Sequence, residues 1–222
     1  MNLFKLRRDR MAEEVQVHNA YSRPLSGYEQ SGERDRSHAP LAQRLCESTG
    51  SDQAYVFTGL YQARQGALAL ARKWGQLYRR GASAMIVIGA VGSSVFADFN
   101  RVPLLDLRAL HAAVDASTIA IIVEPSQTDA AASSLTHRYF QGVEKLCREL
   151  NILLILDEDQ TDTCRCGALL CEEVHNVRAD IVILGNGLGG DLPLAALLTR
   201  GHASTVSADN LTPAISLIRQ HS

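Results

Sequence analysis

Short apolar runs fill the second half of this 222-residue chain and constrain its fold more than any other feature. Two of them, Ile152–Leu156 and Ile181–Leu184, contain only isoleucine, leucine and valine, and each is followed by a polar loop. Strands without polar alternation are typical of a parallel sheet that is buried on both faces. Strand character also appears over residues 54–58, 85–89, 119–123 and 194–199.

Segments of helical periodicity separate these runs. Between Leu60 and Tyr78 apolar residues recur every three or four positions, which predicts a long amphipathic helix with Arg64, Arg72, Arg79 and Arg80 on its outer face. Further helices are expected over residues 39–46, 106–114, 135–150 and 211–218. Strands that alternate with helices predict an α/β fold with a mainly parallel sheet sandwiched by helices.

Composition limits the function classes. A formal net charge of -2 gives no electrostatic reason to expect binding to nucleic acid or to an anionic membrane. No apolar run approaches the roughly 18 residues of a membrane span, and the first residues lack the pattern of a signal peptide. The odd number of cysteines, 5, favours a reducing compartment. We therefore expect a cytoplasmic protein.

The predicted elements divide the chain into three parts. Residues 1–38 are polar and poorly periodic, and are expected to form an N-terminal arm of some flexibility. Residues 39–200 hold the predicted strands and most helices, and are expected to form one α/β domain. Residues 201–222 are expected to form a C-terminal loop and helix.

Polar side chains follow the two strands expected at Ile152–Leu156 and Ile181–Leu184. Asp157 comes directly after one strand and Asn186 lies just beyond the other. In open α/β sheets, ligands bind outside the carboxyl ends of the strands, so these two loops are the first candidates for a site.

Two kinds of metal site are alternative interpretations of nearby residues. The acidic residues Asp157, Glu158, Asp159 and Asp162 offer oxygen atoms that suit a hard cation. Cys164, Cys166 and Cys171 lie near His175, but their spacing lacks the paired C-x₂-C of a structural zinc site. We favour isolated thiols and expect no metal.

Three ordered motifs carry a family resemblance. They are I-A-I-I-V-E-P-S-Q (119–127), L-I-L-D-E-D-Q-T-D-T-C-R-C-G (154–167) and A-D-I-V-I-L-G-N-G-L-G-G-D-L-P (179–193). In order and spacing they resemble the E-P-I-Q, D-E-V-Q-T-G-x-G-R-x-G and P-D-I-x-x-x-x-K-x-L-G-G-G-x-P motifs of the class III aminotransferases. These are fold-type-I pyridoxal-phosphate (PLP) enzymes that include acetylornithine and succinylornithine aminotransferase. Residues 38–210 resemble the family's large domain, and the small domain that follows it is not matched.

The resemblance implies a damaged cofactor site. Asn186 stands where the family has the lysine that forms a Schiff base with PLP, and an amide nitrogen is not nucleophilic. Asp157 matches the acid that holds the pyridine nitrogen protonated. Asp159 replaces a valine that packs on the ring, and a buried unpaired carboxylate there would oppose binding.

Other family positions are partly kept. Glu124, Gln160 and Arg165 match the motifs, and Thr205 matches a threonine that reaches a neighbouring subunit's phosphate. Thr58 and Gly59 are partial substitutes for the family's phosphate-binding turn at a helix N-terminus. The aromatic residue that stacks on the cofactor ring is missing from the segment after Gly89.

These changes favour a degenerate, truncated homologue. We expect a catalytically inactive protein without a cofactor that acts as a homodimeric binding, scaffold or regulatory protein. A protein segment or a small metabolite would occupy the former cofactor cleft. The alternative is a PLP-binding protein, or a residual aminotransferase, that holds PLP without a covalent bond and acts on ornithine-like amino donors.

Overall fold

The computed structural model describes residues 33–89, 94–96, 98–125, 134–158, 168–185, 188 and 194–206. The expected helix over residues 211–218 and most of the expected N-terminal arm lie outside the described residues.

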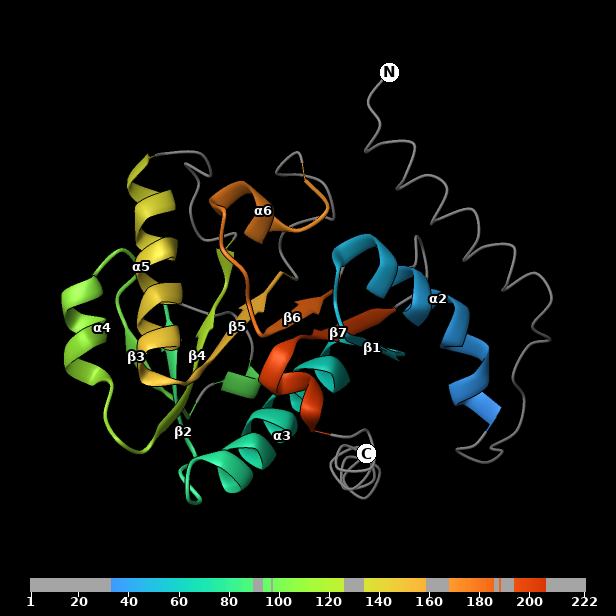
Figure 1. The fold of residues 1–222 in the computed structure, drawn as a ribbon, viewed down its shortest axis with the longest axis horizontal. Coiled ribbons are helices and arrows are strands. Elements are labelled where there is room, and N and C mark those ends of the chain that lie inside the picture. The colour runs from blue at the N-terminus through green and yellow to red at the C-terminus, as the bar shows by residue number, and fades with distance from the viewer. Residues whose placement is uncertain are drawn as a thin grey trace.

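A seven-stranded sheet in the order β1-β7-β6-β5-β4-β2-β3 forms the centre of the molecule (Figure 1). Its parallel part contains β3 (Asn100–Val102), β2 (Ala84–Ile88), β4 (Thr118–Val123), β5 (Leu153–Asp157) and β6 (Ile181–Leu184). At the other side, β7 (Ala195–Thr199) pairs antiparallel with both β6 and β1 (Gln53–Phe57). The expected mainly parallel sheet is confirmed.

Helices cover both faces of this sheet. Long α3 (Leu60–Tyr78) lies on one face with the short 3₁₀ helices η1 (Ser94–Phe96) and η3 (Gly201–Thr205). The other face carries α2 (Glu33–Thr49), α4 (Leu107–Ala113), α5 (Ser134–Leu150) and α6 (Cys171–His175). The central strands between the two helical layers are covered on both faces, and every residue of β4, β5, β6 and β7 is buried.

Several details differ from the sequence-based expectation. The first described helix begins at Glu33 and continues through Pro40 to Thr49, so it is longer than the predicted segment 39–46. Strand β3 and helix α6 were not predicted, because three and five residues are too few to show a hydrophobic period. Leu77 and Tyr78, expected on the apolar face of α3, are 54% and 49% exposed.

Close packing fixes α3 against the sheet. A Cβ atom on Gly75 would come within 2.4 Å of the Ala82 carbonyl oxygen and 2.9 Å of Ile119 Cγ2. The missing side chain therefore lets the helix approach the loop and strand β4 closely. Trp74, beside it, is fully buried in the same apolar cluster.

A buried ion pair joins the chain segments at the amino edge of the sheet. Arg200 Nη1 lies 2.7 Å from Glu172 Oε1, and the two side chains are 7% and 4% exposed. Arg200 also donates to the carbonyl oxygens of Ala179 and Thr49, while Glu172 accepts from the Ala179 amide. The pair thus links α6, the start of β6, the end of β7 and the end of α2.

A buried histidine lies between α5 and α6. The His175 ring stacks on Phe140 at a centroid distance of 4.3 Å and lies 5.0 Å from the His137 ring. Its two ring nitrogens have no hydrogen-bond partner among the described residues. Burial, with a smaller contribution from His137, lowers the pKa of His175 to about 4.

This histidine should make the fold less stable in mild acid. Because the pKa of His175 is about 4 in the folded chain and near 6.5 when unfolded, the unfolded chain binds more protons between these values. Stability should be complete above pH 6.5 and fall by about 2–3 kcal/mol as the pH drops towards 4. Urea denaturation at several pH values would measure this. His175→Phe should flatten the profile, whereas replacing exposed His111 with Gln should not; equal slopes in both variants would contradict the assignment.

No helix in the described ranges combines the length and the apolar character that crossing a membrane requires.

Candidate functional site

Four strands bring the predicted site segments to one edge of the sheet. Strands β4, β5 and β6 are parallel, and β1 runs in the same direction because β7 is antiparallel to both β1 and β6. The carboxyl ends of these strands therefore share an edge, where Thr58, Glu124 and Gly185 follow β1, β4 and β6, and Asp157 is the last residue of β5. In this fold class that edge is the usual position of a ligand.

The central acid of this edge is fully buried and paired. Asp157 Oδ2 accepts a hydrogen bond from Arg64 Nε at 2.6 Å, and the two side chains are 0% and 11% exposed. Arg64 comes from the first turns of α3, so the pair closes the space between the helix and the end of β5. A charge-assisted contact of this length in a water-excluded position is a strong one.

An aromatic ring borders the arginine. The guanidinium carbon of Arg64 lies 5.9 Å from the centroid of the Phe96 ring, and Phe96 is 0% exposed. This is within the range of a cation–π contact. Arg64 thus has an acid on one side and an aromatic side chain on another.

The expected outward orientation of Arg64 is wrong. Arg72 is exposed on the outer face of α3 and Arg80 is exposed just beyond its end, but Arg64 lies on the same stripe as partly buried Leu60 and buried Ala63 and Ala67. These positions have the spacing i, i+3, i+4 and i+7 that defines one helix face. An arginine inside such a stripe was a usable signal for a buried acidic partner. Phe96, in a three-residue 3₁₀ helix, gave no comparable signal.

Two further acids at this edge are buried. Glu124 comes directly after β4 and lies level with Asp157, the last residue of the neighbouring β5, since Val123 and Leu156 are paired; Glu124 is 5% exposed. Glu158 accepts hydrogen bonds from the Cys171 and Glu172 amides at 2.9 and 3.3 Å. A carboxylate at this position satisfies the open amides of the α6 N-terminus.

Two of the four acids that could bind a hard cation already have other partners in this arrangement. Asp157 is directed to Arg64 and Glu158 to backbone amides. The described residues contain no cluster of three or more potential metal ligands. Cys171 is buried, and Cys164, Cys166, Asp159 and Asp162 lie outside the described residues.

The turn before α3 is open. Thr58 is exposed and its hydroxyl donates to Gln62 Oε1 at 2.9 Å. Gly59 is the N-cap of α3 with an extended backbone, and a Cβ atom placed there would meet nothing within 4 Å. The turn lies at the shared edge, as predicted, but no side chain caps the first amides of the helix.

Thr205 lies far from the other predicted residues of the same chain. It follows β7, whose carboxyl end is at the opposite edge, and its hydroxyl pairs with Tyr78 at 3.0 Å and donates to the His202 carbonyl oxygen at 2.7 Å. Tyr78 is the last residue of α3, while Gly59 precedes the first, and a helix of 19 residues is about 28 Å long. Within one chain, Thr205 does not join Thr58 and Asp157.

The remaining predicted positions cannot be placed. Gln160, Arg165 and Asn186 lie outside the described residues.

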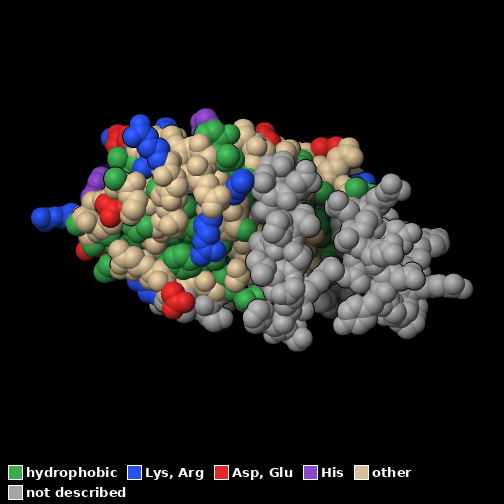
Figure 2. Space-filling view, turned by 90° about the horizontal axis from the view of Figure 1, so that it is seen from below, with side chains coloured by type: hydrophobic (Ala, Val, Ile, Leu, Met, Phe, Trp, Pro, Cys, Tyr) green, Lys and Arg blue, Asp and Glu red, His purple; other side chains and the backbone are tan. Residues whose placement is uncertain are grey.

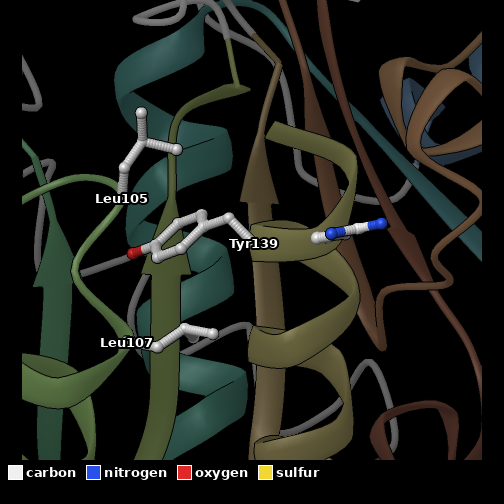
Figure 3. Close-up of a pocket in the computed structure, with 4 residues that line it drawn as sticks. Leu105, Leu107 and Tyr139 are labelled. Atoms are coloured by element: carbon white, nitrogen blue, oxygen red, sulfur yellow. The ribbon is translucent and has the colours of Figure 1, made fainter. Parts of the chain in front are cut away.

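A separate hollow of about 270 Å³ lies on the opposite face of the sheet, between the loop before α4 and helix α5. Figure 3 shows the Tyr139 side chain reaching from α5 into the space between Leu105 and Leu107. Burial raises the pKa of Tyr139 to about 12, so its phenol stays neutral at ordinary pH. The hollow is mostly apolar and contains no pair of groups suited to acid–base chemistry among Leu105, Leu107, Arg138 and Tyr139.

Comparison with known families identifies the chain. Residues 94–210 match the model of the family described as aminotransferase class-III. The chain belongs to the class III aminotransferases. The predicted resemblance is thereby confirmed over the part that contains β3 to β7.

Curated members of the class show the same kinship. The chain is 36% identical over 180 residues to acetylornithine aminotransferase 2 of Bordetella pertussis, covering 72% of this chain and 46% of the relative. It is also 36% identical over 185 residues to the ornithine aminotransferase of the same organism, covering 72% and 45%. The chain spans about half the length of these curated relatives.

Solved structures of class III aminotransferases share the fold. The ornithine δ-aminotransferase of Plasmodium falciparum superimposes with a TM-score of 0.71 at 28% identity, covering 89% of this chain and 51% of that one. The N-acetylornithine aminotransferase of Stenotrophomonas maltophilia gives 0.71 at 22% identity, covering 94% and 57%. The expected fold, the large-domain architecture of fold-type-I PLP-dependent transferases, is confirmed.

The class is PLP-dependent, yet the described residues of this chain fit PLP poorly. The acid that the family resemblance assigns to the ring nitrogen is Asp157, and its carboxylate already pairs with Arg64 at 2.6 Å without access to water. A bound ring would have to displace a guanidinium that is covalently part of the protein.

Proposed function

We propose that this chain is a non-catalytic class III aminotransferase that acts as a binding, scaffold or regulatory protein. The observation that carries the proposal is the buried contact between Arg64 and Asp157. An acid that already neutralises an internal cation is not available to hold a proton on a cofactor ring. Asn186, at the family's lysine position, supports the same conclusion from the sequence.

The proposal assigns Asp157 a role in the fold. Its carboxylate joins the end of β5 to α3, and the backbone beside it is fixed because Asp157 pairs with Ile183 of β6. The chain thus uses a residue of the ancestral site to stabilise the edge at which that site lay.

The direct test is to titrate the purified protein with PLP. We expect no saturable absorbance change from PLP bound at the carboxyl edge of the sheet, where borohydride reduction and mass spectrometry would locate any covalent adduct. We also expect no rise in Tm and no amino transfer from ornithine or acetylornithine to a 2-oxo acid. Asn186→Lys restores the amine but leaves Arg64 in place, so this variant should also fail to transfer amino groups. Lys145→Arg controls for adduct formation at Lys145, which is 73% exposed.

Saturable PLP binding by the unmodified protein, accompanied by amino transfer, would overturn the proposal. It would establish the alternative, a residual aminotransferase with a non-covalently held cofactor.

Self-association is part of the proposal. Figure 2 shows the molecule from below the view of Figure 1, on the side of α3. Apolar side chains lie beside basic ones on this surface. Leu77 and Tyr78 of α3 are about half exposed, as is Tyr61 at its start. A homodimer would cover such a surface, and sedimentation analysis should then give about twice the mass of one 24.2 kDa chain. A single monomeric species at micromolar concentration would contradict this element.

A further inference from the structure

We infer that the carboxyl end of β5 is a binding site for a planar organic cation, and that the side chain of Arg64 is its built-in occupant. This inference rests on the proposed function and deepens it, because it names the ligand class of the former cofactor site and the residue that closes it. Removing the Arg64 side chain should leave a site that small guanidinium, amidinium or heteroaromatic cations can enter.

The site has a rigid anionic wall. Asp157 is 0% exposed and ends a strand that is paired on both sides, with β4 and with β6. Its carboxylate therefore cannot turn to water if its partner is lost. A buried anion in this position requires a cation, a proton or a hydrogen-bond donor close by.

The aromatic wall favours a flat cation. Phe96 is 0% exposed, and its ring centroid lies 5.9 Å from the Arg64 guanidinium carbon. A delocalised planar cation can donate N–H bonds in its plane to a carboxylate and also contact an aromatic ring. A tetrahedral ammonium of equal charge has no such plane and is more strongly hydrated.

The covalent attachment of the Arg64 guanidinium to α3 explains why the site is closed to free cations in the unmodified protein. Arg64 is anchored on α3 next to buried Ala63 and Ala67, so its guanidinium is held at the site at a high effective concentration. A free ligand must displace this cation and leave it without its acid. The site is thus occupied without any diffusing ligand.

Chemical rescue of Arg64→Ala tests the inference. The substitution removes a fragment equivalent to ethylguanidine, so ethylguanidinium chloride at millimolar concentration is the matched probe. We expect the Tm of Arg64→Ala to rise saturably, by about 2–4 °C at a few multiples of Kd. Ethylammonium and tetramethylammonium chloride should give a clearly smaller rise. Imidazolium and 4-aminopyridinium should act like ethylguanidinium.

Two further proteins serve as controls. The unmodified protein should not respond to ethylguanidinium, because Arg64 holds the site. The double variant Arg64→Ala/Asp157→Asn should not respond either, because the carboxylate that binds the cation is gone. An equal response in all three proteins would overturn the inference, as would a folded Arg64→Ala variant that does not distinguish planar from tetrahedral cations.

The test decides even if Arg64→Ala does not fold. In that case ethylguanidinium, or the added Asp157→Asn substitution, should restore the circular dichroism of the folded chain. Failure of ethylguanidinium to restore it, whether or not Asp157→Asn does, would overturn the inference. None of these failures touches the proposed function, which depends on PLP binding and amino transfer by the unmodified protein.

Discussion

Arg64→Met should lower the free energy of unfolding by about 3–5 kcal/mol, because it leaves the Asp157 carboxylate buried without its cation. Methionine keeps much of the side-chain length, so the loss reports the charge more than the volume. Urea denaturation followed by circular dichroism would measure it. The Asp157 side chain is 0% exposed, so solvent does not contact the carboxylate in this fold.

Asp157→Asn should cost less than Arg64→Met. Arg64 is 11% exposed and can move its charge towards solvent, whereas Asp157 cannot. Arg148→Met is the matched control, since Arg148 forms an ion pair with Glu144 at 2.9 Å but is 71% exposed. Its loss should be within about 1 kcal/mol. Losses of similar size for Arg64→Met and Arg148→Met would contradict a buried pair.

Arg200→Met should be as damaging as Arg64→Met, with a loss of about 3–5 kcal/mol at neutral pH. The substitution leaves the Glu172 carboxylate, which is 4% exposed, without its cation. It also removes the hydrogen bonds to the Ala179 and Thr49 carbonyl oxygens. Equilibrium denaturation of Arg200→Met and of the double variant Arg200→Met/Glu172→Gln would separate the charge from the hydrogen bonds. The double variant should recover part of the loss.

The pH dependence of Arg200→Met gives an internal check. Burial raises the pKa of Glu172, and Arg200 is the main group that opposes this rise. Without Arg200 the folded chain should bind a proton at Glu172 more readily than the unfolded chain does, so the stability deficit should shrink as the pH falls. A deficit that stays constant as the pH falls would show that the lost hydrogen bonds, and not the charge, dominate.

The architecture was predictable because its strands are nearly pure apolar runs. The segments 119–123, 152–156 and 181–184 became β4, β5 and β6 with boundaries shifted by one residue at most. The direction of β7 was not predictable, since an apolar strand buried on both faces reads the same in either direction. Strand β3 was missed because its polar Asn100 and Arg101 are held by edge pairing with β2 and not by burial.

The site was predictable in its position but not in its contacts. A strand followed by Asp157 marked the correct edge of the sheet. The partner of Asp157 lies 93 residues earlier in the chain, and only the packing of α3 on the sheet brings the two together. The expectation that Arg64 faces outward was wrong, because it followed the rule that an arginine on a helix is usually exposed. The position of Arg64 between Leu60, Ala63 and Ala67 indicated a buried cation.

The coupling free energy between Arg64 and Asp157 tests the central claim most directly. It is obtained by denaturing the unmodified protein, Arg64→Met, Asp157→Asn and the double variant under one set of conditions. If Arg64 holds the Asp157 charge inside the fold, the double variant should be more stable than Arg64→Met, and the coupling should exceed about 2 kcal/mol. Losses that add to within about 0.5 kcal/mol would contradict the claim.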